Sequence, residues 1–162
     1  MITHPKASHR NNSKNQARAV ARLHAVQALF QMEATNQTQN IVQQEFEIHR
    51  FGQMIDDTEL AHGDVDLFRK TLADAVTWQA KIDQMTDRAL VSAWPIDRID
   101  PTLRALFRAA GAELLRGVAP PKIVITEFVD VARAFFPDGR EPKFVNAVLD
   151  HMARAAKPDA FV

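Results

Sequence analysis

The chain has 162 residues, of which 46% are hydrophobic and 25% charged, with 5 glycines, 8 prolines and no cysteine. This length and composition are typical of one globular domain, which buries roughly 70% of its unfolded surface and needs no disulfide or structural metal to fold. The lack of cysteine excludes thiol catalysis, zinc ribbons and iron–sulfur clusters, and no stretch resembles a membrane span or signal peptide. We therefore expect a cytoplasmic protein without a membrane segment, metal or cofactor.

The formal net charge of zero hides an uneven distribution along the chain. Residues 1–32 carry five bases and no acid, residues 33–100 carry 13 acids and 6 bases, and residues 101–162 carry 9 bases and 7 acids. The local net charges are therefore +5, −7 and +2. A basic N-terminal stretch favours a polyanionic partner, and a basic tail that only aids solubility is the alternative.

Hydrophobic residues recur at helical spacing along most of the chain, and strand signals are almost absent. Residues 1–12 are expected to form a flexible tail. Ser13 to Gln16 has the form of a capping box and predicts a first helix over about residues 14–33. Its inward positions are predicted to be Val20, Leu23, Val26 and Phe30.

The middle of the chain predicts two or three further helices. A second helix is expected to end near residue 54, and the acidic stretch from Asp56 to Glu59 follows it as a loop. Asp64 is predicted to cap a third helix, whose pattern continues to Leu90 as an extension or as a fourth helix. His62 and Asp64 together only superficially resemble metal ligands, because capping explains Asp64 better.

Trp94-Pro95 interrupts the helical pattern and is the expected boundary between an N-terminal subdomain, residues 13–94, and a C-terminal subdomain, residues 95–156. Trp78 and Trp94 are expected to pack in the core or between the subdomains rather than to stack on bases.

The C-terminal subdomain is predicted to contain three helices. Asp100 and Pro101 open the first of them, which stops at Gly117. Pro121 opens the next, near residues 121–136, and Pro142 starts the last. Residues 157–162 are expected to fray. The chain as a whole predicts an all-α fold of about seven helices in two small bundles.

Lys14, Arg18 and Arg22 follow one another at intervals of four residues on the first predicted helix. This spacing places them within a stripe of about 80°, which we call the basic ridge and expect to lie opposite much of the Val26 and Phe30 face. Cations near a helix N-terminus are unfavourable for stability, so their presence suggests binding, and a phosphate backbone is the natural ligand. A solvated polar face without a ligand is the alternative.

A second candidate site lies at the start of the last predicted helix. Lys143 adds positive charge there, next to the free N–H groups of a helix N-terminus. Phe144 could stack on a base, and Asn146 could form hydrogen bonds that distinguish one base from another. A core phenylalanine with a solvated lysine beside it is the commoner explanation of such a pattern. We find no phosphate-binding glycine loop and no catalytic triad pattern, which argues against an enzyme.

Four segments of the chain form an ordered pattern. The first begins with Ala17-Arg18 and continues through Arg22 to Phe30, and the others span 106–115, 121–127 and 143–150. Together they resemble the NusB family of bacterial transcription antitermination factors. The resemblance covers roughly residues 14–155 and implies a NusB-like, all-helical fold of two small bundles.

The resemblance also implies a function. Lys14, Arg18 and Arg22 would take the basic-helix role in binding boxA RNA, and Lys143 and Phe144 the role of the second RNA contact. The protein partner would be ribosomal protein NusE, and the pair would join the elongating RNA polymerase to support ribosomal RNA transcription. Some members of the family dimerise through surfaces that overlap the RNA site, so a homodimer is a possible resting form.

The chain departs from the family pattern at a few positions. Ala19 follows Arg18 where family members often have consecutive arginines, and Arg140 stands where they often carry an acid. We expect Arg140 to add attraction for RNA, and alanine at Arg18 or Arg22 to weaken RNA binding with helicity intact.

Two other functions compete with this interpretation. One is an RNA-binding module related to that of ribosomal RNA cytosine methyltransferases, whose catalytic part needs a nucleophilic cysteine that this chain lacks. The other is a self-associating scaffold without an RNA role.

Overall fold

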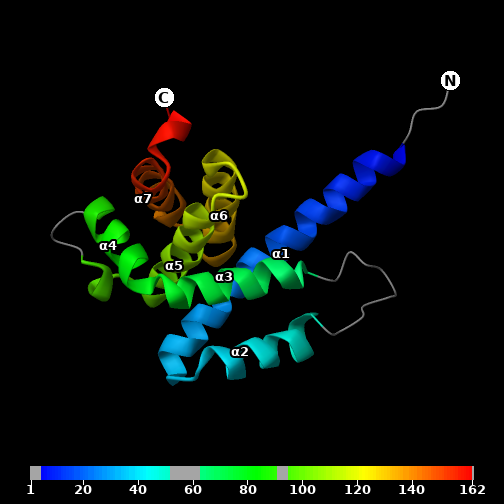
Figure 1. The fold of residues 1–162 in the computed structure, drawn as a ribbon, viewed down its shortest axis with the longest axis horizontal. Helices are drawn as coiled ribbons and strands as arrows, with labels where there is room; N and C mark the ends of the chain where they lie inside the picture. Colours follow the sequence, from blue (N-terminus) through cyan, green and yellow to red (C-terminus); the bar gives the residue numbers. More distant parts are fainter. Residues whose placement is uncertain (1–4, 52–62, 91–94, 162) are drawn as a thin grey trace.

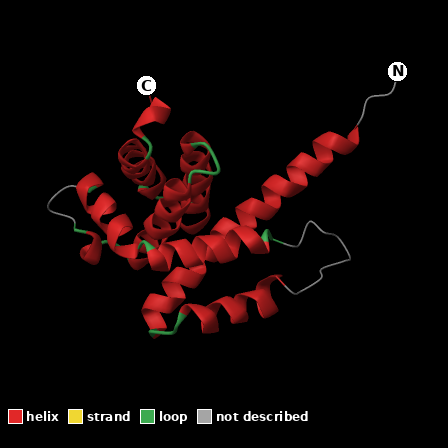
Figure 2. Ribbon diagram, viewed as in Figure 1, coloured by secondary structure: helices red, strands yellow, loops and turns green. Residues whose placement is uncertain are grey.

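A computed structural model describes residues 5–51, 63–90 and 95–161, and every regular element in these ranges is helical (Figures 1 and 2). The described ranges contain seven α-helices, and the all-α prediction with about seven helices is confirmed. The helices are α1 (Pro5–Thr35), α2 (Gln39–Phe46), α3 (Val65–Thr77), α4 (Gln79–Ala89), α5 (Pro101–Arg116), α6 (Pro121–Phe135) and α7 (Glu141–Ala156). None of the helices in these described ranges is long and apolar enough to cross a bilayer.

Three predicted helix ends are confirmed because they depend on local chemistry. The Asp64 side chain accepts a hydrogen bond of 3.0 Å from the Leu67 N–H at the start of α3. Asp100 accepts one of 2.7 Å from the Thr102 N–H at the start of α5, with Pro101 in the first turn. Gly117 ends α5 with a φ of 72°, the left-handed conformation that glycine adopts without strain.

The first helix begins at Pro5 instead of near residue 14, so the capping box predicted at Ser13 is wrong. Proline is tolerated in a first helical turn, and no helix breaker separates Pro5 from Thr35. The flexibility of residues 1–12 stays a prediction.

The second predicted helix differs in detail from the structure, and one of the two alternatives predicted after the third helix is confirmed. A π-helical turn, Glu47–Phe51, follows α2, and the acidic loop from Asp56 to Glu59 lies outside the described residues, as do His62 and Trp94. The predicted continuation after α3 is a separate helix, because the backbone turns at Trp78. Trp78 is 50% exposed, so the expectation that its side chain packs inside is wrong.

Helix α5 forms the centre of the molecule and packs against α1, α3, α4, α6 and α7 (Figure 1). Small residues allow this close packing: a Cβ added at Gly111 would lie 2.4 Å from Ile82 Cγ2. Buried side chains from residues before and after the predicted boundary at 94/95 belong to one hydrophobic cluster. A shared cluster does not by itself test the division into two subdomains, which stays a prediction.

The buried face of α1 agrees with the predicted inward positions except at Phe30. Val26 is fully buried as predicted, but Phe30 is 40% exposed, so its inward placement is wrong. Alanines at positions 21, 25 and 28 are buried instead. Small side chains allow two helices to pack closely. Which residues of α1 are buried therefore depends on the surface of α5 as well as on the sequence of α1.

Candidate nucleic-acid interface

Two cations of the predicted basic ridge, Lys14 and Arg18, are exposed on the N-terminal half of α1. Among the described residues, no carboxylate forms an ion pair with either side chain. Because α1 begins at Pro5, both lie well inside the helix, so the argument from an unfavourable helix N-terminus does not apply to them. Their exposure keeps them available to an anionic ligand.

The third cation of the ridge, Arg22, is only 4% exposed, and its predicted solvent-facing position is wrong. Its guanidinium Nε donates hydrogen bonds of 2.9 and 3.2 Å to the two carboxylate oxygens of Glu113, and its terminal nitrogen donates one of 2.6 Å. Glu127 of α6 lies 3.6 Å away. Arg22 therefore joins α1 to α5 and α6, and its charge is neutralised inside the protein.

Helical geometry explains why Arg22 turns inward. Each step of four residues advances about 40° around an α-helix, so Arg22 lies close to the buried Val26 even though Lys14 does not. Burial by itself lowers the pKa of Arg22, but the hydrogen bond and charge of Glu113, with the charges of Glu127 and Asp64, raise this pKa overall. The guanidinium is thus held in its charged form.

A groove of about 520 Å³ lies beside Arg18, between α1, the start of α3 and the turn that joins α5 to α6. Arg18 and Lys70 contribute exposed cations to it. Val118 and Ile123, which are 82% and 49% exposed, contribute apolar side chains. We call this feature the α1–α6 groove.

The start of α3 is held against α1 at this groove. The backbone N–H of Asp64 donates a 2.9 Å hydrogen bond to the carbonyl of Ala17, next to Arg18. The chain can approach this closely because residue 63 is glycine: a Cβ there would lie 2.4 Å from the Phe51 ring and 2.9 Å from Val20. This contact places Lys70 of α3 on the same groove as Arg18 of α1.

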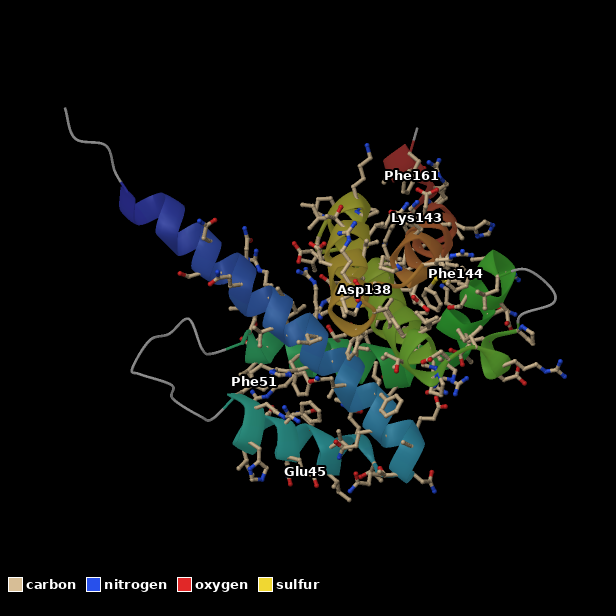
Figure 3. The ribbon with its side chains drawn as sticks, turned by 180° about the vertical axis from the view of Figure 1, so that it is seen from behind. Glu45, Phe51, Asp138, Lys143, Phe144 and Phe161 are labelled. Carbon is tan, nitrogen blue, oxygen red and sulfur yellow. The ribbon has the colours of Figure 1, made fainter. Side chains whose placement is uncertain are left out.

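The residues of the second predicted site lie on and before α7. Arg140, Lys143 and Asn146 are exposed. Phe144 is half-buried, and its ring packs edge-on against Phe107 of α5 with centroids 6.0 Å apart. Figure 3 shows Lys143 and Phe144 on α7. Phe144 therefore contributes to the core, which is the commoner role for such a residue.

The structure does not bring the two predicted sites together. Helix α1 runs antiparallel to α5, because Glu33 contacts Arg104 while Arg22 contacts Glu113. Phe144 packs on α5 at Phe107, about ten residues, or roughly 15 Å of helix, from the level of Arg18. Helix α6 lies between α1 and α7 (Figures 1 and 3). The two predicted sites are thus separated by α6.

Three residues of the groove were not predicted from the sequence as site residues: Lys70, Val118 and Ile123. Lys70 is a single lysine on α3, 52 positions after Arg18, and nothing in its local pattern distinguishes it. The exposed Val118 follows the helix stop at Gly117, and this adjacency was a usable signal, because an apolar residue in an exposed turn is unusual.

Comparison with known proteins identifies related sequences over most of the chain. The NusB family model matches residues 19–154. The chain is 44% identical over 158 residues to the transcription antitermination protein NusB of Maricaulis maris, covering 96% of this chain and 98% of that protein. It is also 44% identical over 149 residues to the protein of the same name from Brucella abortus, covering 87% and 86% of the two chains.

Solved structures share the fold. The crystal structure of the antitermination factors NusB and NusE in complex with dsRNA has a chain that matches with a TM-score of 0.70 and 24% identity, covering 86% of this chain and 97% of that one. The structure of T. maritima NusB matches with a TM-score of 0.68 and 26% identity, covering 89% and 96%. The first of these similarities concerns the fold alone.

Proposed function

The chain belongs to the NusB family of non-enzymatic transcription antitermination proteins, and from this premise we propose that it binds boxA RNA together with ribosomal protein NusE. The RNA–protein complex would join the elongating RNA polymerase in the cytoplasm and support ribosomal RNA transcription. A protein of the same fold has been crystallised with NusE and dsRNA, which supports RNA and NusE as the partners to test.

The observation that carries the RNA-binding proposal is the pair of exposed cations on α1. Lys14 and Arg18 have no carboxylate partner in the described part of the chain, so a phosphate does not need to displace one. Phosphate contacts of this kind hold and orient a strand, and sequence preference comes from contacts with unstacked bases. The proposed role is thus positional: the protein holds RNA while NusE adds surface and links the complex to the polymerase.

We also propose that Arg140, Lys143, Asn146 and the half-buried Phe144 form a second contact with the same RNA. Their separation from Arg18 suits a single strand that crosses α6, since each nucleotide of an extended strand spans several ångströms. Arg22, which the sequence placed in the RNA site, is assigned to the protein core instead.

Substitution of Arg18 tests the proposed function. Arg18→Ala is expected to weaken binding of a boxA-containing RNA by about 3- to 10-fold and to reduce the slope of log affinity against log salt by about 0.7, because one phosphate contact is lost. Fluorescence anisotropy titrations with boxA and scrambled RNA, each with and without NusE, measure both quantities.

The control for this titration is Arg88→Ala, which removes an exposed arginine from α4, away from the groove. Its affinity should match that of the parent, and circular dichroism should show equal helicity for all three proteins. An Arg18→Ala protein that binds boxA RNA as tightly as the parent at every salt concentration would contradict the proposal. Light scattering during the same titration detects a homodimer, and self-association without any RNA binding would favour the scaffold alternative.

A further inference from the structure

We infer that the α1–α6 groove is a nucleotide-binding site for single-stranded RNA, in which Arg18 and Lys70 bind a phosphate and Ile123 and Val118 contact the base of the adjoining nucleotide. The inference rests on the proposed function and extends the RNA site from α1 to α3, to the turn between α5 and α6 and to the first turn of α6. These elements contribute the two residues, Lys70 and Ile123, on which the test depends.

Two cations of the groove are available to an anionic ligand, although the side chains that line it carry no net charge as a whole. Four cations and four carboxylates line it, but Arg22 is occupied by Glu113 and Glu127. Arg116 is paired with Asp74 at 3.7 Å, and the Asp64 carboxylate caps α3. The side chains that remain without such a partner are two cations, Arg18 and Lys70, and one exposed acid, Asp66.

The cations have a favourable setting in the groove. Pro120 and Ile123 line it at the start of α6, where no acidic residue occurs in the first turn and no side chain caps the helix. The positive end of this helix dipole therefore adds to the field of Arg18 and Lys70. The helix end only reinforces the site, because the two side chains carry the full charges.

The apolar side of the groove suits a nucleobase. Val118 and Ile123 are 82% and 49% exposed, whereas most aliphatic side chains of α5 and α6 are buried. The two prolines between them restrict the backbone of the turn, so these side chains are presented in a preorganised position. An unstacked base has apolar faces next to a charged phosphate, and the groove offers the same combination of apolar surface and cations.

The size and rigidity of the groove are suitable for a nucleotide of single-stranded RNA. Its volume of about 520 Å³ falls within the range of roughly 300–1,000 Å³ that is typical of small-ligand sites. Its walls are tied together by the Arg22–Glu113 ion pair between α1 and α5 and by the Asp64 to Ala17 hydrogen bond between α3 and α1. Arg18 and Lys70 therefore line one groove whose walls are already joined before RNA binds.

Two matched pairs of variants test the inference in RNA titrations. Lys70→Ala is compared with Lys81→Ala, an exposed lysine of α4. Ile123→Asp is compared with Ile41→Asp, because Ile41 of α2 is 48% exposed and Ile123 is 49% exposed. We expect Lys70→Ala to weaken boxA RNA binding by about 3- to 10-fold with a salt slope smaller by about 0.7, and Ile123→Asp to weaken it at least 10-fold.

The two control variants should bind within twofold of the parent, and thermal melts should establish that all four variants fold. In addition, RNA containing 4-thiouridine should crosslink to the peptide that spans residues 118–123, as mapped by mass spectrometry. This readout does not depend on substitution of the groove.

The outcomes distinguish failure of this inference from failure of the proposed function. If Arg18→Ala weakens RNA binding but Lys70→Ala and Ile123→Asp do not, the groove is not the nucleotide site while the RNA-binding function stands. If the groove variants keep their RNA affinity and lose NusE, the groove is a protein-docking surface and the inference is overturned. If the parent protein binds no RNA, the proposed function fails and the inference fails with it.

Discussion

Two arginines of α1, Arg18 and Arg22, have opposite roles. Arg18 and Arg22 are one helical turn apart, yet Arg18 is exposed and Arg22 is 4% exposed with two hydrogen-bonded oxygens of Glu113 at its Nε. A buried charge is tolerated only with a partner, and removing one member of such a pair typically costs about 3–5 kcal/mol. Arg22 therefore stabilises the fold, while Arg18 is available for binding.

Alanine at Arg22 is expected to destabilise the protein strongly, because Glu113 would keep its charge in a buried site without its main partner. The free energy of unfolding of Arg22→Ala, measured with urea, should fall by about 3–5 kcal/mol relative to the parent. Replacing both members, Arg22→Met with Glu113→Leu, should recover much of this loss. An Arg22→Ala protein that is as stable as the parent and binds RNA less tightly would instead place Arg22 in the RNA site.

Among the helices, the expected RNA contacts lie on α1 and at the start of α7. Packing of both helices on α5 separates Arg18 from Lys143, and α6 lies between them (Figure 3). Arg140 precedes α7, is exposed, and has no side-chain capping bond to the helix. Its charge is therefore directed to solvent at the end of α7 that carries Lys143.

Charge reversal at Arg140 measures the contribution of the start of α7. Arg140→Glu is expected to weaken boxA RNA binding and to reduce the salt slope, because one cation near the strand is replaced by an anion. The same titration on Arg88→Glu, which makes the same charge change on α4, should show a much smaller effect because salt screens charges beyond about 8–10 Å. Equal affinities and slopes for Arg140→Glu and the parent would refute the role of Arg140.

Across the whole molecule, an ion-pair network joins three helices, α1, α4 and α5, whose residues are far apart in the sequence. Glu33 at the end of α1 pairs with Arg104 and Arg108 of α5, and Arg108 also pairs with Asp83 of α4 at 2.9 Å. Arg104 in addition donates hydrogen bonds to the carbonyls of Ile96 and Ile99. The network fixes the far end of α1 against α5, as Arg22 does near its middle.

This network predicts a dependence of stability on pH. The hydrogen bond from Arg104 lowers the pKa of Glu33 from its usual 4.5, and the charges of Arg104 and Arg108 add to this effect despite partial burial. A carboxylate with a lowered pKa stabilises the folded state above its unfolded pKa, and this stabilisation is lost as the pH falls through the lower folded-state pKa.

Glu33→Gln is therefore expected to be less stable than the parent by about 1 kcal/mol at pH 7, with the difference shrinking as the pH falls below about 4. Urea unfolding at a series of pH values measures this difference. Asp159→Asn, which alters an exposed carboxylate near the C-terminus, serves as the control and should follow the parent. A stability gap that stays constant down to pH 3 would contradict the assigned role of Glu33.

The sequence by itself determined those features that depend on a few adjacent residues. The caps at Asp64 and Asp100 and the stop at Gly117 follow from hydrogen bonding and backbone freedom within one helical turn. Helical spacing and four family-like segments were sufficient to predict the all-α fold and the NusB family.

Which side chains face solvent, and which segments meet, depended on how the helices pack together. Packing of α1 on α5 and α6 buried Arg22 and left Phe30 exposed, and the close approach at Gly63 placed Lys70 on the same groove as Arg18. The physical reason is that burial and groove formation depend on the fit between surfaces far apart in sequence, whereas a cap or a helical repeat is completed by its own neighbours.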